Sequence, residues 1–366
     1  MSVEKLFEPL SLAHGPAMKN RFMLAPLTNL QSHPDGRMSD EEFHWLTMRA
    51  DGGFAVTMTC AAHVQAVGQG FPGQMGIFGD QHLEGLTRLA HTIKAKGSIA
   101  AAQLHHAGNR SPKDLVGQPV CPSEDAKTGA RGLTLAEVEG LRDDFIAAGV
   151  RAQTAGFDGI EVHGAHGYVL AQFLSAEVNR REDRYGGSLE NRARIVFEII
   201  DGIRARCRPD FQIGLRLSPE RFGLKLAEIR DVAAEVLRQE KIDYLDMSLW
   251  DYAKEPVEEE HKAQGRSLMS FFTDLPRGRV RLGAAGKITG AQQAAEAIAR
   301  GCDYVLIGRA AILRHDFPQR VRRDAHYESP SLPVTVQHLR DEGLSPKFIA
   351  YMNGWPGFVA PEEVAA

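Results

Sequence analysis

Three residues able to hold or move a proton stand within the six residues that begin at position 163, in the segment HGAHGY. They are His163, His166 and Tyr168. A neutral imidazole can donate a hydrogen bond to an oxygen that gains negative charge, and a tyrosine with a pKa near ~10 is still protonated at neutral pH. A lone histidine is usually structural, but this cluster predicts a site that binds a polar ligand and can protonate it. A zinc site from the same histidines is a weaker alternative, because it needs a third ligand.

Other polar residues occur in the same setting, directly after short apolar runs typical of β-strands. A buried interior should not place so many hydrogen-bonding groups on one face without a ligand to satisfy them. These segments are Ala25-Pro26-Leu27-Thr28, Gln103, His105-His106, Arg216, Gly283-Ala284-Ala285-Gly286-Lys287 and Gly308-Arg309.

The chain alternates between short aliphatic or β-branched runs and longer amphipathic segments. Two of the longer segments begin with residue pairs typical of capped helices: Thr134 with Glu137, and Ser39 with Glu42. The predicted strands are 21–27, 54–60, 98–104, 159–163, 211–217, 244–248, 279–285 and 304–308. The predicted helices include 80–96, 134–155, 188–206, 226–240 and 289–300.

Strands that each lead into a helix or crossover predict an α/β fold, a (β/α)8 TIM barrel in which residues 1–366 form a single domain. An open doubly wound sheet is the alternative, but the first strand lacks the G-x-G-x-x-G turn of dinucleotide-binding sheets. In a barrel the C-terminal strand ends share one face, so the polar strand ends would meet there. The barrel core is expected at about 20–315.

The remaining segments are expected to frame the barrel. An N-terminal hairpin within 6–20 would close the end opposite the active face, and 105–132 and 249–266 would form extended βα loops at that face. The tail from residue 315 onward contains four widely spaced prolines and is expected to wrap around the outside.

Two glycines and an arginine predict an anion site. Loops after the seventh and eighth strands of a barrel commonly bind phosphate through backbone N–H groups, and glycine lets a ligand approach closely. Gly286, Gly308 and Arg309 occupy those loops, and the guanidinium of Arg309 could add a charge-assisted pair of hydrogen bonds.

The composition excludes several classes of protein. With 43 basic and 47 acidic residues the net charge is −4, so a nucleic-acid partner is not expected. Cys60, Cys121, Cys207 and Cys302 are too far apart for a short-spaced metal or iron–sulfur motif. The sequence shows neither a signal peptide nor an apolar run of the ~20 residues that span a bilayer, so we expect a cytoplasmic enzyme that is not bound to a membrane.

The chain resembles the Old Yellow Enzyme family of FMN-dependent oxidoreductases. The resemblance rests on HGAHGYVLAQFLSAEVNRREDRYGGSLENR at 163–192, together with NRFMLAPLT at 20–28, FPGQMGI at 71–77, QLHHAG at 103–108 and YVLIGRA at 304–310. These motifs cover nearly the whole chain in the family's order. The resemblance implies an ene-reductase in which tightly but non-covalently bound FMN takes hydride from NADH or NADPH and passes it to the β-carbon of an alkene conjugated to a carbonyl or nitro group.

The resemblance also implies roles for individual residues. The backbone of Ala25, Pro26, Leu27 and Thr28, with Thr59, would lie along the flavin, and the Thr28 hydroxyl would bond near its C4 oxygen. Gln103 would read the pyrimidine edge, Arg216 would face N1 and the C2 oxygen, and Gly286, Gly308 and Arg309 would hold the phosphate. His163 and His166 would bind the substrate oxygen, and Tyr168 would protonate the α-carbon. The partners would be small electron-poor alkenes, with phenols as inhibitors and a homodimer as one possible assembly.

Two positions depart from the family pattern, and several others are left without an assigned role in the cavity. Asn109 separates Gly108 from Arg110, where many members of the family have glycine followed directly by arginine, and we assign Arg110 no role. Met58 stands where many relatives carry glutamate. The sequence leaves open whether His105, His106, Trp250 and Tyr252 line the pocket. Arg181, Asp183 and Arg184 are expected to form structural ion pairs.

Two other functions fit a barrel of this kind. A flavin-free aldolase or isomerase acting on phosphorylated sugars would need a strand-end lysine for a Schiff base, and Lys287 is the nearby candidate. A non-catalytic flavin-binding protein would keep the cofactor site without the chemistry.

Overall fold

The computed structural model describes residues 2–361, and its centre is a closed barrel of eight parallel strands. Around the barrel the strands follow the order β1-β10-β9-β8-β7-β6-β3-β2. The strands are β1 (Phe22–Leu24), β2 (Val56–His63), β3 (Ile99–His105), β6 (Gly159–Gly164), β7 (Gln212–Leu217), β8 (Tyr244–Ser248), β9 (Arg281–Ala285) and β10 (Tyr304–Ile307). The eight predicted strands are confirmed, and closure of the sheet excludes the doubly wound alternative.

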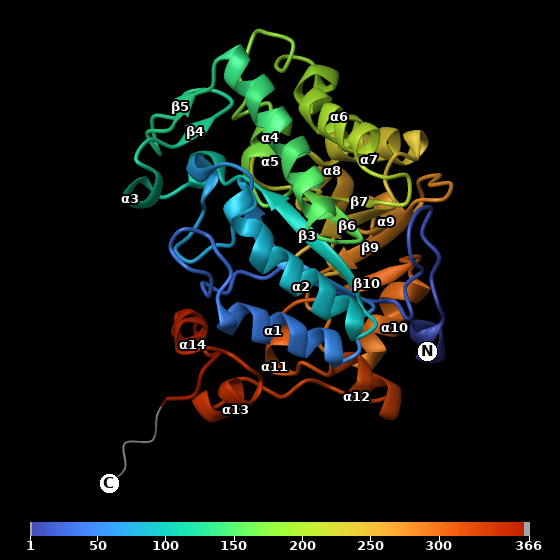
Figure 1. Ribbon diagram of the computed structural model, residues 1–366. Coiled ribbons are helices and arrows are strands. Elements are labelled where there is room, and N and C mark those ends of the chain that lie inside the picture. The colour runs from blue at the N-terminus through green and yellow to red at the C-terminus, as the bar shows by residue number, and fades with distance from the viewer. Residues whose placement is uncertain (1, 362–366) are drawn as a thin grey trace.

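Helices surround the barrel (Figure 1). Thr134 and Glu137 form the predicted capping box, and the Ser39 hydroxyl accepts the backbone N–H of Glu42. The α-helices are α1 (Asp40–Asp51), α2 (Leu83–Ala95), α3 (Lys113–Val116), α4 (Leu135–Thr154), α5 (Val169–Leu174), α6 (Leu189–Arg206), α7 (Leu226–Gln239), α8 (Glu259–Lys262), α9 (Ser270–Thr273), α10 (Ala291–Ala299), α11 (Arg309–Leu313), α12 (Phe317–Arg323), α13 (Val336–Asp341) and α14 (Pro346–Asn353). Short 3-10 turns lie at η1 (Glu4–Phe7), η2 (Ala66–Gly68), η3 (Asp80–His82) and η4 (Gly108–Arg110).

The predicted N-terminal hairpin closes the end of the barrel where the strands begin. Leu10 and Met18 form an antiparallel bridge. At the start of β7 the Gln212 amide donates hydrogen bonds to the backbone carbonyls of His14 and Pro16, at 2.9 and 2.8 Å. In Figure 1 this segment lies at the right, opposite the side toward which the arrow of β3 points. A ligand must therefore enter from the other end.

Two tyrosines, at the starts of β8 and β10, fill the barrel interior toward the N-terminal ends of the strands, and two glycines make room for their rings. A Cβ on Gly214 would lie 2.1 Å from the ring of Tyr244, and one on Gly283 would lie 2.2 Å from the ring of Tyr304. Each glycine therefore provides the space into which a facing ring packs. The barrel interior is thus a packed core, as is usual for this fold, and the space for a ligand lies at the C-terminal strand ends.

Segments after the strands carry additional structure on that open face. The loop 105–132 contains α3 and the short parallel pair β4 (Val120–Cys121) and β5 (Arg131–Gly132), which project from the barrel in Figure 1. The C-terminal tail packs along the outside through α12 to α14, and the ring of Phe348 contacts that of Trp45 on α1 at 5.5 Å. The tail also returns to the open face, where α14 contributes to the cavity described below.

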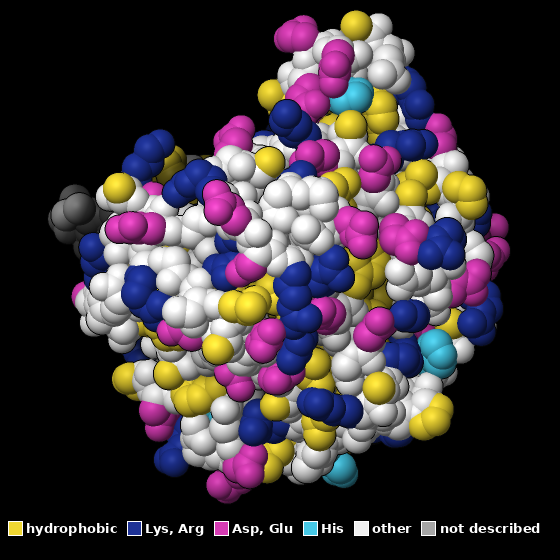
Figure 2. Space-filling view, turned by 90° about the horizontal axis from the view of Figure 1, so that it is seen from above, with side chains coloured by type: hydrophobic (Ala, Val, Ile, Leu, Met, Phe, Trp, Pro, Cys, Tyr) yellow, Lys and Arg dark blue, Asp and Glu magenta, His cyan; other side chains and the backbone are white. Residues whose placement is uncertain are grey.

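The surface shows no segregation of charge on the face in Figure 2, where acidic and basic side chains are interspersed. Within residues 2–361, no helix is both long and apolar enough to cross a bilayer. Two of the few exposed large apolar side chains, Trp250 and Trp355, lie at a single cavity.

Glu42 on α1 is a buried acidic residue whose ionisation should change the stability of the fold. Its carboxyl is fully buried and accepts hydrogen bonds from Ser32 and Asn29. Burial is the largest effect on its pKa and raises it above the ordinary value. A raised folded-state pKa means that the folded chain holds the proton more tightly, so stability is lost as pH rises above the pKa of an unfolded glutamate.

We therefore expect Glu42→Gln to stabilise the protein increasingly above pH ~5, by about 1.4 kcal/mol for each unit by which the folded pKa is raised. Denaturant unfolding at pH 4 and pH 8 measures this difference. An equal effect of the substitution at both values would contradict the assignment.

Candidate active site

A cavity of about 340 Å3 opens at the C-terminal ends of the barrel strands. Its volume is within the range of small-molecule sites. A larger surface hollow of about 560 Å3 between α6 and α7 is lined by helix residues alone, so the strand-end chemistry does not reach it. The residues lining the strand-end cavity are Pro26, Leu27, Thr28, Ala61, Phe71, Gln103, Arg110, His163, His166, Tyr168, Arg216, Arg221, Phe222, Trp250, Arg309, Ile312, Tyr351, Met352 and Trp355.

Most of the predicted site residues therefore meet in one cavity, and four do not line it. Ala25 belongs to the buried core below. Thr59 lies behind Gln103 and accepts its backbone N–H at 3.2 Å. A Cβ on Gly308 would meet only Leu27 and Ala25, at 3.6 and 3.9 Å. Gly286 (φ +156°) packs so closely on the backbone of Asp251 that a Cβ would lie 2.7 Å from its nitrogen.

Among the residues that the structure describes, each of the two site histidines has one ring nitrogen without a hydrogen-bond partner. At the end of β6 the Nδ1 of His163 accepts the backbone N–H of Ala165 at 3.3 Å, so the ring proton of neutral His163 is on Nε2. His166 follows in a left-handed backbone conformation (φ +60°), with its nitrogen bonded to the Ser218 hydroxyl at 2.9 Å. The two ring centres are 5.0 Å apart.

Ser248, at the end of β8, holds the ring of His166. Its hydroxyl lies 2.6 Å from Nε2 of His166 and accepts a hydrogen bond from Arg216 at 3.4 Å. A hydroxyl has one proton and two lone pairs, so Ser248 can either donate to this Nε2 or accept from it. Within residues 2–361, Nδ1 of His166 makes no hydrogen bond.

Both rings are neutral. Burial is the largest effect on each and holds the pKa of His163 and His166 well below 6.5. The nearby guanidiniums of Arg216 and Arg110 lower both pKa values further. At neutral pH the pair can therefore bind an oxygen through hydrogen bonds without a change of charge.

Tyr168 is held among these rings at the N-cap of α5. Its ring centre lies 5.3 Å from that of His163 and 4.4 Å from that of His105, in edge-to-face contacts. The guanidinium of Arg110 lies 4.8 Å from the ring centre and also donates to the backbone carbonyl of His166. Within residues 2–361 the Tyr168 hydroxyl makes no hydrogen bond, so it can serve a ligand.

The structure settles the residues left open above. His105 is buried against Tyr168, and the Nδ1 of His106 accepts the backbone N–H of Gly108 at 3.0 Å. Trp250 lines the cavity, whereas the Tyr252 hydroxyl is directed away to Glu296 at 2.7 Å. Met58 is fully buried in the core cluster that also contains Ala25.

Arg110 and the tail residues are cavity residues that sequence reasoning missed. We assigned Arg110 no role because its spacing departs from the family pattern, but it contacts Tyr168 and lines the cavity. Tyr351 and Trp355 come from α14 and the turn after it, and the pKa of Tyr351 is raised by burial, with Thr28 among its neighbours. No sequence motif indicates that these two aromatic residues reach the cavity. Their aromatic character is the only feature of the tail sequence that could have suggested it.

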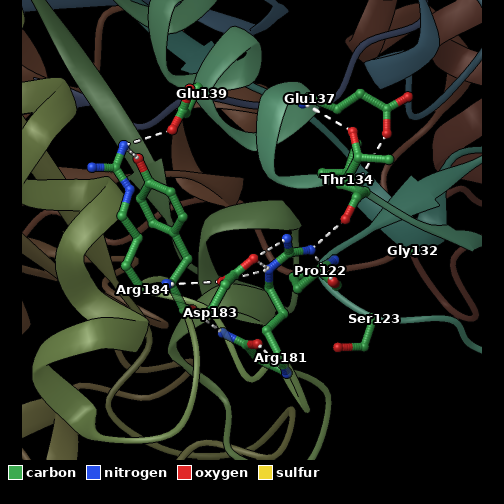
Figure 3. Close-up of polar contacts among 12 residues, drawn as sticks. Pro122, Ser123, Gly132, Thr134, Glu137, Glu139, Arg181, Asp183 and Arg184 are labelled. Atoms are coloured by element: carbon green, nitrogen blue, oxygen red, sulfur yellow. Dashed lines mark hydrogen bonds and ion pairs between the residues drawn. The ribbon is translucent and has the colours of Figure 1, made fainter.

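The second half of the sequence signature is structural, as predicted. Arg181 pairs with Asp183 at 2.5 Å and donates to the backbone carbonyls of Pro122 and Leu133 (Figure 3). Arg184 pairs with Glu139 at 2.8 Å. These contacts fasten the loop after α5 to the β4–β5 segment and to α4.

The cavity fits a flavin mononucleotide. Gln103 and Arg216 offer an amide and a guanidinium to the same cavity, and both groups can bind the polar edge of a pyrimidine. Arg309 lies next to the open side of Gly308, and within residues 2–361 its guanidinium has no ion pair or hydrogen bond, so it is free for a phosphate.

Comparisons with known proteins agree with this geometry. Residues 5–328 match the NADH:flavin oxidoreductase / NADH oxidase family. The chain is 35% identical over 329 residues to the probable NADH-dependent flavin oxidoreductase YqiG of Bacillus subtilis, covering 87% of each chain. Among solved structures it resembles morphinone reductase in complex with tetrahydroNAD (28% identity, TM-score 0.76, 91% and 93% covered) and the Old Yellow Enzyme homologue of Zymomonas mobilis (27%, 0.78, 92% and 96%). The chain therefore belongs to the Old Yellow Enzyme family and is an NAD(P)H-dependent oxidoreductase whose cofactor is FMN.

Proposed function

We propose that this protein is an ene-reductase, which uses NADH or NADPH to reduce alkenes conjugated to a carbonyl or nitro group. The observation that carries the proposal is a set of three polar atoms in one cavity that make no hydrogen bond within residues 2–361: Nε2 of His163, Nδ1 of His166 and the hydroxyl of Tyr168. FMN, when bound, supplies the hydride for the β-carbon.

His163 and His166 would bind the activating oxygen of the alkene. Electron density moves onto that oxygen as hydride arrives, so two donors aimed there stabilise the transition state more than the ground state. Because both imidazoles stay neutral, they donate hydrogen bonds without giving up a proton. Phenols carry a similar oxygen on a flat ring and should compete for the same two donors.

Tyr168 would give its proton to the α-carbon, completing the addition of hydride and proton across the double bond. Arg110 beside its ring favours any negative charge that remains on the phenol oxygen. The proton is regained from solvent through the open cavity.

The FMN would be held by residues from several strand ends. Thr28 and Gln103 would bind its polar edge, and the positive charge of Arg216 would favour the reduced form. The backbone of Ala25, Pro26 and Leu27, with Thr59 behind, would flank the ring, and Gly286, Gly308 and Arg309 would hold the phosphate.

The test is a substrate panel. FMN-loaded protein with NADH or NADPH should convert enones, maleimides and nitroalkenes to the saturated products, identified by mass spectrometry with one deuterium at the β-carbon when deuterated nicotinamide is used. Oxidation of nicotinamide by oxygen alone, with every alkene recovered unchanged, would reject the proposal in favour of a flavin protein without this activity.

The aldolase alternative finds little support in the geometry. The ammonium group of Lys287 pairs with Asp251 at 3.1 Å and its side chain is 59% exposed. A Schiff-base lysine is usually desolvated to lower its pKa.

Ser248 gives a prediction about positioning. Ser248→Ala removes the hydrogen bond that holds the ring of His166, and one such bond is worth about 0.5–1.5 kcal/mol, so phenol binding should weaken about 2- to 10-fold. Flavin reduction by nicotinamide should change little. Ser248→Thr keeps the hydroxyl and should restore the affinity, and unchanged affinity in the alanine variant would show that Ser248 does not position the ring.

A further inference from the structure

Two buried carboxyl groups lie directly behind the polar residues of the cavity. The Gln103 amide donates to Oε1 of Glu161 at 2.8 Å. Nε of Arg216 forms an ion pair with Oδ2 of Asp246, also at 2.8 Å. Glu161 and Asp246 are both 0% exposed.

Several buried polar atoms of this layer make no hydrogen bond. Within residues 2–361 they are Oε2 of Glu161, both carboxylate oxygens of Asp246, Nε of Arg216 and the Tyr244 hydroxyl, and the contact between Arg216 and Asp246 is an ion pair only. Arg216 is the only cation among the groups that influence Glu161, and its close contact is with Asp246. Buried carboxylates without a counter-charge are costly, so the cluster favours a proton on one of the two acids. The charged, titratable or polar groups that face Glu161 are Gln103 from β3, Arg216 from β7, Asp246 and Tyr244 from β8 and Tyr304 from β10.

Glu161 is the acid that should carry this proton. Burial has the largest effect and raises the pKa of Glu161, and the negative charge of Asp246 raises it further. Arg216 and the Gln103 hydrogen bond lower it, but less strongly. Asp246 has the guanidinium at contact distance and Glu161 does not.

We propose that Glu161, at a pH where its carboxyl is ionised beside oxidised flavin, takes up one proton when a flavin held at Gln103 and Arg216 is reduced, and that it thereby sets how the flavin's midpoint potential depends on pH. The inference rests on the proposed seat of FMN at these two residues. Glu161 is a positioning residue in this account, because it acts through Gln103 and through the charge balance around Arg216.

The balance of charge gives the reason. Reduction of FMN brings two electrons and the proton that arrives with hydride, which leaves one negative charge beside Arg216. Asp246 offsets part of the charge of that guanidinium, so the added negative charge is only partly balanced by Arg216 and raises the proton affinity of Glu161. Its carboxylate then takes one proton from solvent, forming a single O–H bond, and no other bond changes.

The midpoint potential of the FMN-bound wild-type protein, measured by dye-coupled titration from pH 5.5 to 9.5, tests the proposal. In a two-electron couple, each proton taken up changes the potential by about 30 mV per pH unit, because a tenfold change in equilibrium constant corresponds to about 30 mV. We expect a range of pH with a slope of about 60 mV, bounded by slopes of about 30 mV. A slope of about 30 mV throughout would overturn the proposal.

Two variants identify the group that takes up the proton. Glu161→Gln keeps an oxygen for the Gln103 amide but cannot be protonated, so the steep range should disappear. Asp246→Asn removes the neighbouring negative charge, so the steep range should move to lower pH and the potential should rise at all pH values. Glu42→Gln, which also replaces a buried glutamate of raised pKa but contacts neither Gln103 nor Arg216, should keep the wild-type curve.

A steep range that persists in Glu161→Gln would place the second proton elsewhere, including on the flavin itself, and would refute the proposal. The Asp246→Asn curve gives an independent answer if Glu161→Gln does not fold, since an unshifted steep range there would also refute it. Potentials are measured without any alkene. Failure of this inference is therefore distinct from failure of the ene-reductase proposal, which is decided by product formation.

Discussion

Tyr168→Phe should slow flavin reoxidation by an enone about 10²–10⁴-fold, which corresponds to about 3–5 kcal/mol in the barrier, and should leave flavin reduction by nicotinamide near the wild-type rate. The substitution removes the hydroxyl but keeps the ring that contacts His105, His163 and Arg110. Enone reduction needs a proton at the α-carbon, whereas flavin reduction takes none from this tyrosine. Nitroalkenes should be affected less, because the nitronate left after hydride transfer is stable without protonation.

Stopped-flow absorbance of the two half-reactions separates the proton donor from a structural tyrosine. Tyr185→Phe is the matched control, since its buried hydroxyl bonds to Glu198 outside the cavity and its loss should spare both half-reactions. Equal slowing of both half-reactions by Tyr168→Phe, or no slowing with an enone, would end the assignment of Tyr168 as the donor.

The double variant His163→Ala, His166→Ala should weaken phenol binding and slow enone reduction together, because both would use the same two donors. Loss of one oxyanion donor typically costs about 10²–10³ in rate, and loss of both should reach at least that range. Phenol affinity is measured from the long-wavelength absorbance that a phenol stacked on FMN should produce.

His166→Asn is the informative companion, since an amide retains an N–H donor of similar reach. With His163 unchanged, this variant should retain part of the phenol affinity and part of the rate of enone reduction. If the double alanine variant binds phenol with wild-type affinity, the histidines do not form the oxyanion site.

The barrel could be predicted because its strands are short and apolar and its helices carry local capping signals such as Thr134 with Glu137. The cavity could be predicted because polar residues at strand ends, such as Gln103 and Arg216, are costly to bury unless a ligand or another group satisfies them. Alternation along β6 even signals the buried acid, since Glu161 and His163 are two residues apart and therefore face the same side of the strand.

Other parts of the site depend on contacts between distant segments. Tyr351 and Trp355 reach the cavity only because α14 packs back onto the open face, and no local pattern encodes that path. Ser248 looks like any strand-end serine until His166 and Arg216 are placed on either side of it. The family spacing gives no role to Arg110, whereas its position in the loop after β3 brings its guanidinium to Tyr168 and to the cavity.

The most direct test of the central claim is a single anaerobic turnover. Protein with bound FMN is reduced by one equivalent of NADPH, freed of nicotinamide, and mixed with cyclohexenone while the flavin spectrum is recorded. We expect the oxidised spectrum to return without oxygen and one equivalent of cyclohexanone to form for each flavin. A flavin that stays bleached until air is admitted, with the enone unchanged, would contradict it.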